Sequence, residues 1–134
     1  MPNTGTVQSG TIASAISGAT VGLLHEYTGR GPTKARTYIW EDFITVVLQD
    51  TLTMGERSLV RDGRADLVLT TRKAFQRTMG PQLIAAVEEH TGRIVEAFLS
   101  DNHIDPDVAV ESFVLAPRNT GKVDIARANA GAPM

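Results

Sequence analysis

The sequence predicts an α+β domain: a four-stranded antiparallel sheet with helices on one face, in the order α-β-β-α-α-β-β. Three observations predict this two-layer fold. Apolar residues recur every three or four positions in two long segments, which is typical of helices. Residues that favour strands gather in two pairs of short segments, and each pair has a short polar connection, as hairpins do. No compact β-α-β unit occurs between them, so the sheet is expected to be antiparallel.

The first helix and the first hairpin lie in the N-terminal half. Apolar spacing of three and four predicts a helix over residues 10–28. Gly29 and Pro32 end it, because glycine accepts a left-handed helix end and proline prevents the helix from resuming. Strands are predicted over residues 36–40 and 43–49, which are rich in β-branched and aromatic side chains.

Two helices are expected next. The segment from Thr53 to Glu56 has the form of a capping box, in which the threonine and glutamate side chains satisfy each other's backbone amides. A short helix should therefore begin there and end near Gly63. A long helix follows over residues 65–90, and Gly80-Pro81 should kink or split it because proline lacks an amide proton.

A second hairpin closes the fold. Thr91-Gly92 is a typical helix end, and strands are predicted over residues 93–100 and 109–115, joined by a polar loop at 101–107. So few helices are not expected to cover both faces of the sheet. We therefore expect a homodimer that buries the open face.

Length and composition limit the class of protein. At 134 residues the chain is expected to form one domain, over residues 10–116, between flexible ends at residues 1–9 and 117–134. The formal net charge of −2 argues against nucleic-acid binding, and no apolar run approaches the roughly 20 residues that membrane insertion requires. The chain has no cysteine, which fits a cytoplasmic location and excludes disulfides and thiolate chemistry.

The stretch GRGPTKAR offers the first candidate binding site. Arg30, Lys34 and Arg36 could present donors to a small anion, and alternation places the last two on one side of a strand. No nucleotide-binding glycine motif is present, and a turn explains the glycines and the proline. Arg72 joins this candidate anion set because it interrupts an apolar helical stripe, where it must either extend to solvent or meet a buried anion.

The predicted loop at 101–107 offers a candidate metal site. Asp101, His103 and Asp105 supply oxygen and nitrogen ligands within five residues. The loop lacks the central glycine and distal glutamate of an EF-hand, and the same residue types suit an ordinary hairpin loop. No catalytic residue and no cofactor is predicted.

Three segments together resemble the MpsC-like family, long catalogued as a domain of unknown function. They are HEYTGRGPTKARTYIWEDFITVVLQDTLTMGE (25–56), VEEHTGRIVEAFLSDNHIDPD (87–107) and AVESFVL (109–115). The resemblance spans about residues 10–116. The segment around Gly55 departs from the family pattern, which commonly carries a proline in the form L-T-P-x-E, but the cap does not need that proline.

The resemblance sets the functional expectation. The family is named for a membrane-potential-generating system whose other components resemble cation or inorganic-carbon uptake proteins, so it implies a soluble accessory or regulatory role. We expect a non-enzymatic module that binds a membrane transport protein partner or a small anion. The alternative is a ligand-binding protein or hydrolytic enzyme that uses Arg36, Arg72 and His103, which requires these three side chains to converge in one pocket.

Overall fold

The computed structural model describes residues 2–118, with side chains from residue 10 onward, and its elements follow the predicted order. Residues 119–134 of the predicted tail at 117–134, and the side chains of residues 2–9, lie outside the described part. The elements are α1 (Pro2–Thr28), β1 (Lys34–Trp40), β2 (Phe43–Gln49), α2 (Met54–Arg61), α3 (Ala65–Thr91), β3 (Val95–His103) and β4 (Val108–Leu115). The predicted α+β fold is confirmed.

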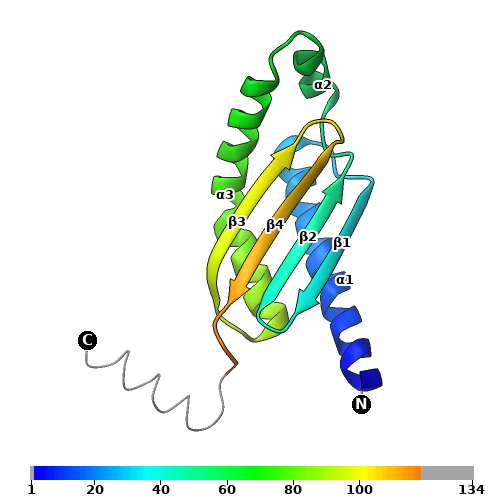
Figure 1. Ribbon diagram of the computed structural model, residues 1–134, viewed down its shortest axis with the longest axis vertical. Helices are drawn as coiled ribbons and strands as arrows, with labels where there is room; N and C mark the ends of the chain where they lie inside the picture. Colours follow the sequence, from blue (N-terminus) through cyan, green and yellow to red (C-terminus); the bar gives the residue numbers. More distant parts are fainter. Residues whose placement is uncertain (1, 119–134) are drawn as a thin grey trace, which may run out of the picture.

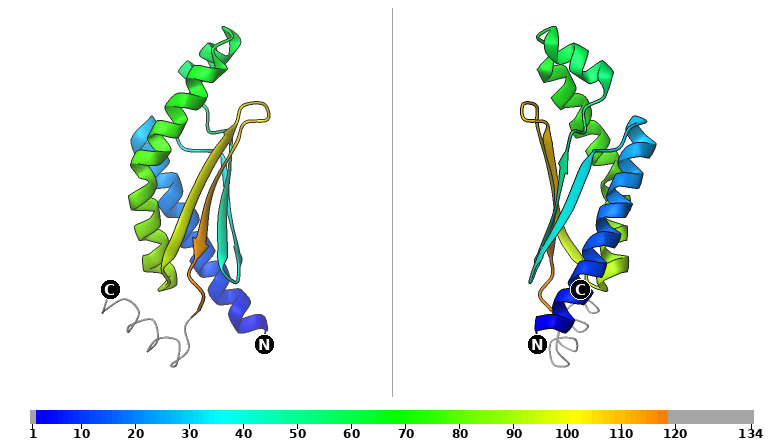
Figure 2. Two further views of the ribbon diagram at one scale, coloured as in Figure 1. Left: turned by 60° about the vertical axis from the view of Figure 1, so that its left-hand side comes forward. Right: turned by 90° about the vertical axis from the view of Figure 1, so that its right-hand side faces the viewer.

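The molecule has two layers, as Figures 1 and 2 show. The strands form one antiparallel sheet in the order β1-β2-β4-β3, so that β1 and β3 are the two edges. Both long helices cover the same face of the sheet, and the other face is open. The short helix α2 and the beginning of α3 project beyond one end of the sheet (Figure 1).

The core lies between the sheet and the two long helices. Strict alternation along β2 and β4 buries every second side chain, because successive residues of a strand point to opposite faces. The helices contribute residues at a spacing of three or four. The buried cluster consists of Ile16, Leu24, Ile44, Val46, Leu48, Met79, Leu83, Val87, Ala109, Phe113 and Leu115.

Gly80-Pro81 was predicted to kink or split the long helix α3, and the split is wrong, because the helix continues through both residues. Pro81 is exposed, whereas Met79 and Leu83 on either side of it are fully buried. This packing holds the helix together despite the missing amide proton. Gly80 has a separate role: a Cβ atom there would lie 3.2 Å from the ring of Phe98, so glycine permits the close approach of β3.

Several boundaries also differ from the predictions, since β1 begins at Lys34 rather than residue 36 and β3 at Val95 rather than residue 93. Helix α1 begins at Pro2 rather than near residue 10, and proline is favoured in the first turn because the amide it lacks would have no partner there. The predicted loop at 101–107 is shorter than expected. Residues 101–103 pair with β4, so that only residues 104–107 form the turn.

The helix ends follow the expected local rules. Thr53 and Glu56 form both halves of the capping box. Gly29 and Gly92 end α1 and α3 with positive φ angles of 78° and 70°.

We expect Gly92→Ala to lower the free energy of unfolding by about 1 kcal/mol, because a Cβ atom disfavours the left-handed conformation. Gly18→Ala is the matched control: Gly18 is an exposed position inside α1 with nothing within 4 Å of the added carbon. There the same change should raise stability by up to about 1 kcal/mol. Urea denaturation of both variants checks the opposite signs, and a shared sign would contradict the assignment.

The open face is arranged in rows that run across all four strands. The pairing register puts Trp40, Phe43, Val114 and Ala97 in one row, and Tyr38, Thr45, Ser112 and Leu99 in the next. The third row holds Arg36, Val47, Val110 and Asp101, and the fourth holds Lys34, Gln49, Val108 and His103. Three aromatic side chains stack along one end of this face, since the rings of Tyr38 and Trp40, and of Trp40 and Phe43, are each 5.8 Å apart.

Candidate functional site

Three connections meet at the end of the sheet where α2 projects: residues 29–33, 50–53 and 104–107. The amide of Asp50 donates a hydrogen bond of 3.0 Å to the carbonyl of Asp107, which ties the β2–α2 connection to the β3–β4 turn. Residues from distant parts of the sequence are thus held side by side.

Asp50 is the centre of an ion-pair cluster at this end. It has a positive φ of 58°, which only a minority of residues other than glycine adopt. One carboxylate oxygen accepts a bond of 2.9 Å from Arg30, and the other pairs with Arg57. Arg30 also donates to the carbonyl of Leu52 at 3.2 Å. The hydrogen bond from Arg30, with the charges of both arginines, holds the pKa of Asp50 below its ordinary value.

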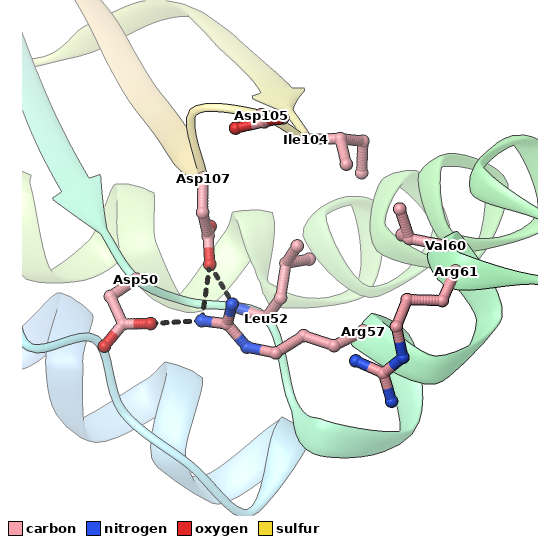
Figure 3. A pocket seen from close by; sticks show the side chains of 8 residues that line it. All are labelled: Asp50, Leu52, Arg57, Val60, Arg61, Ile104, Asp105 and Asp107. Atoms are coloured by element: carbon pink, nitrogen blue, oxygen red, sulfur yellow. Dashed lines mark hydrogen bonds and ion pairs between the residues drawn. The ribbon is translucent and has the colours of Figure 1, made fainter.

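Asp107 completes the cluster from the opposite side. Its carboxylate accepts hydrogen bonds from the Thr51 hydroxyl at 3.1 Å and the Leu52 amide at 2.9 Å. It also pairs with Arg57 at 3.3 Å, so that this arginine bridges the two aspartates (Figure 3). The bonds fix the chain that leads into α2 and therefore set the position of that helix.

A pocket of about 450 Å³ opens beside this cluster. Its lining consists of Asp50, Leu52, Arg57, Val60, Arg61, Ile104, Asp105 and Asp107 (Figure 3). Arg57 is held by both aspartates, whereas Arg61 forms no ion pair or hydrogen bond with any of the described side chains. A guanidinium beside an apolar wall is suited to bind a carboxylate, because it offers paired donors in a partly desolvated setting.

The predicted anion-binding residues lie in different surroundings. Arg30 is used within the chain by Asp50. Lys34 and Arg36 are exposed on the open face, on one side of β1 as alternation predicted, and within residues 10–118 neither has an ion-pair partner. They line a hollow of about 560 Å³ together with Tyr38. Their predicted role as anion ligands stays a prediction.

Arg72 lies on the helical side of the sheet and is 3% exposed. Its Nε and Nη2 atoms donate to the two carboxylate oxygens of Glu56 at 2.8 and 2.6 Å, and Nη2 also donates to the Thr51 carbonyl at 2.7 Å. Arg72 therefore does not extend to solvent but pairs with an anion inside the protein, the partly buried carboxylate of Glu56. Burial would raise the pKa of Glu56, but the bonds from Arg72 and the Thr53 amide hold it below its ordinary value.

The candidate metal residues lie on β3 and in the turn that follows it, whereas the three residues of the enzyme alternative lie apart. Asp101 and His103 belong to β3, and within residues 2–118 no group of three or more acidic or histidine side chains is placed to hold a metal ion. The Nδ1 atom of His103 instead donates a hydrogen bond of 2.8 Å to the Pro106 carbonyl. Arg36 and His103 lie on opposite edge strands, and Arg72 lies on the other side of the sheet. The convergence that the enzyme alternative requires is therefore absent.

A buried polar cluster between α3 and the sheet was not predicted. Glu111 is 1% exposed and is hydrogen-bonded to Ser100 and, at 3.2 Å, to Gln76. Gln76 and Asn102 exchange two side-chain bonds of 2.9 Å. Burial raises the pKa of Glu111 to about 7, against the opposing effect of these bonds. The burial of Glu111 could have been predicted from the sequence, because alternation places it on the same face of β4 as three buried apolar residues.

The pocket residues were also missed. Asp50, Arg57, Arg61 and Asp107 carry no motif, and only the fold brings the β3–β4 turn against α2. The molecule thus defines a class of protein: a two-layer α+β domain with an open sheet face and an ion-pair cluster beside a pocket.

Comparison with known proteins identifies the family. The family described as "Na+-translocating membrane potential-generating system (MpsC)" matches residues 8–117, and the chain belongs to this family. No curated protein and no solved structure gives a significant match. Within the part of the chain that the structure describes, no helix is both long enough and apolar enough to cross a membrane.

Proposed function

We propose that this chain is a non-enzymatic accessory module of a sodium-translocating membrane system, and that it works as a homodimer in the cytoplasm. The family description supports the link to such a system, and the match extends over nearly the whole described domain. The open sheet face supports the dimer, because Tyr38, Trp40 and Leu99 are exposed on it, and exposed apolar side chains gathered on one face are typical of a contact surface.

The observation that carries the proposal is the unpaired Arg61 in the pocket at the end of the sheet. Arg57 and Asp107 hold the walls in place through bonds within the chain, so the pocket exists before any partner binds. Val60 and Ile104 add apolar surface to the same pocket. This chemistry fits an acidic segment of a protein partner, with a carboxylate on Arg61 and an apolar side chain beside it.

The projection of α2 makes the pocket reachable. Its lining comes from residues 50–61 and 104–107, and α2 projects beyond the end of the sheet (Figures 1 and 2). A dimer therefore leaves both copies of the pocket free to contact the membrane-bound components.

We expect Arg61→Glu to abolish the accessory function while the protein stays folded, because Arg61 is exposed and makes no bond within the described chain. In cells that lack the chain, the wild type should restore the sodium-dependent membrane potential, measured with a voltage-sensitive dye, and Arg61→Glu should not. Arg64→Glu is the control, since it makes the same charge change at an exposed position outside the pocket. Full restoration by Arg61→Glu would refute the pocket as the contact site.

A further inference from the structure

The open face is apolar at one end and carries charges on its edges at the other. In its middle strands, half-buried valines are interrupted by the hydrogen-bonded pair Thr45 and Ser112, and Trp40 and Leu99 on the edge strands are 52% and 56% exposed. The side chains of β1 are bulky along this face, whereas those facing the same side of β3 include the small Ala97. The two edges therefore differ in both size and charge.

Arg36 on one edge and Asp101 on the other carry opposite charges. They lie in the same cross-strand row, at opposite edges of the sheet. Three strand spacings of about 4.8 Å separate them by about 14 Å, which is too far for an ion pair within one chain. Both are exposed, and neither has an ion-pair partner among the side chains of residues 10–118.

We propose that two copies stack their open faces about a twofold axis parallel to the strands, so that Arg36 of each copy pairs with Asp101 of the other. This inference rests on the homodimer proposed above and specifies its symmetry. Such an axis places β1 of one copy over β3 of the second and keeps each row at the same level. Stacked sheets lie about 10 Å apart with strands nearly aligned, a gap that facing side chains fill.

The same axis matches the faces in shape. It places Trp40 over Ala97 and Tyr38 over Leu99 of the second copy, so that large rings meet small or flexible side chains. Each interface then contains two Arg36–Asp101 pairs, because a twofold contact repeats every interaction.

The other way to stack the two faces is less favourable. A twofold axis across the strands puts each strand over its own copy and reverses the order of the rows. Asp101 would then face Leu99, which buries a carboxylate without a partner. Charge complementarity thus selects the axis parallel to the strands.

A charge exchange on the full chain tests this symmetry. We expect Arg36→Asp and Asp101→Arg each to raise the dimer dissociation constant about tenfold or more, because like charges then face each other twice per dimer. An equimolar mixture of the two variants should form a one-to-one heterodimer, since each variant supplies the charge that the other has lost. Sedimentation velocity measures the association, and native mass spectrometry of chains with different tags identifies the heterodimer.

Arg64→Asp and Asp62→Arg are the matched controls, because they make the same changes at exposed positions between α2 and α3. They should leave the dissociation constant unchanged. A wild-type chain that stays monomeric would refute the dimer and this symmetry together. If the wild type is a dimer but the equimolar mixture of the two variants does not form a heterodimer, the symmetry alone is refuted. Neither result bears on the Arg61 pocket.

Discussion

Arg72→Met should lower the free energy of unfolding by about 3–5 kcal/mol, the largest single effect that we expect in this molecule. Methionine fills much of the volume of the arginine stem but removes the guanidinium. The carboxylate of Glu56, whose side chain is only 13% exposed, then loses its charged partner, and the Thr51 carbonyl loses its bond from Arg72. Urea denaturation monitored by circular dichroism measures the loss.

A second substitution separates the cost of an unpaired charge from lost packing. Glu56→Gln removes the charge, and glutamine can still reach back to the Thr53 amide as the capping box requires. The double variant Arg72→Met with Glu56→Gln should therefore recover part of the stability lost by Arg72→Met alone. A larger loss in the double variant would contradict this account.

Arg57→Met is the matched control on the protein surface. Arg57 also pairs with carboxylates, but its side chain is 43% exposed, so solvent screens the interaction. The expected loss is below about 1 kcal/mol. The contrast between Arg57 and Arg72 would show that burial, rather than the number of ion pairs, decides the effect.

The predictable part of the fold depends on local rules. The capping box at Thr53 and Glu56 and the helix ends at Gly29 and Gly92 involve residues that are neighbours in the sequence, and all of them are confirmed. Alternation also placed Lys34 and Arg36 on the same side of β1. Such features follow from backbone geometry that a few residues determine.

The candidate site could not be predicted in the same way. Arg30 looked like a ligand for an external anion, but its partner is Asp50, 20 residues away with no periodic relation to it. Pro81 looked like a helix break, but the buried residues on either side depend on contacts with distant strands. In both cases tertiary packing, which the local pattern does not encode, decides the outcome.

Glu111 gives the clearest case of a residue whose environment determines its chemistry. It points into the helical layer from β4, and burial raises the pKa of its carboxyl from 4.5 to about 7, while the nearby charge of Arg72 acts in the opposite direction. The folded protein therefore holds the proton more tightly than the unfolded chain. This contribution to stability is fully present below pH 4.5 and is lost as pH rises through about 7.

We compare the free energy of unfolding of Glu111→Gln with that of the wild type at each pH. Between pH 4 and pH 8 this difference should shift by about 3 kcal/mol in favour of the variant. Glutamine resembles the protonated acid, because its amide can donate toward Ser100 while its oxygen accepts from Gln76. The difference between variant and wild type isolates this group, since Asp50 and Glu56 titrate equally in both proteins. Denaturation curves at several pH values measure the difference.

Glu96→Gln makes the same change at an exposed position on β3 and should alter stability by less than about 0.5 kcal/mol at every pH. The wild type and this control should then lose stability together between pH 4.5 and 8, while Glu111→Gln does not share the loss. A difference that stays constant across this range would mean that the Glu111 carboxyl does not change its charge there, and the buried cluster would then have to stabilise an ionised carboxylate.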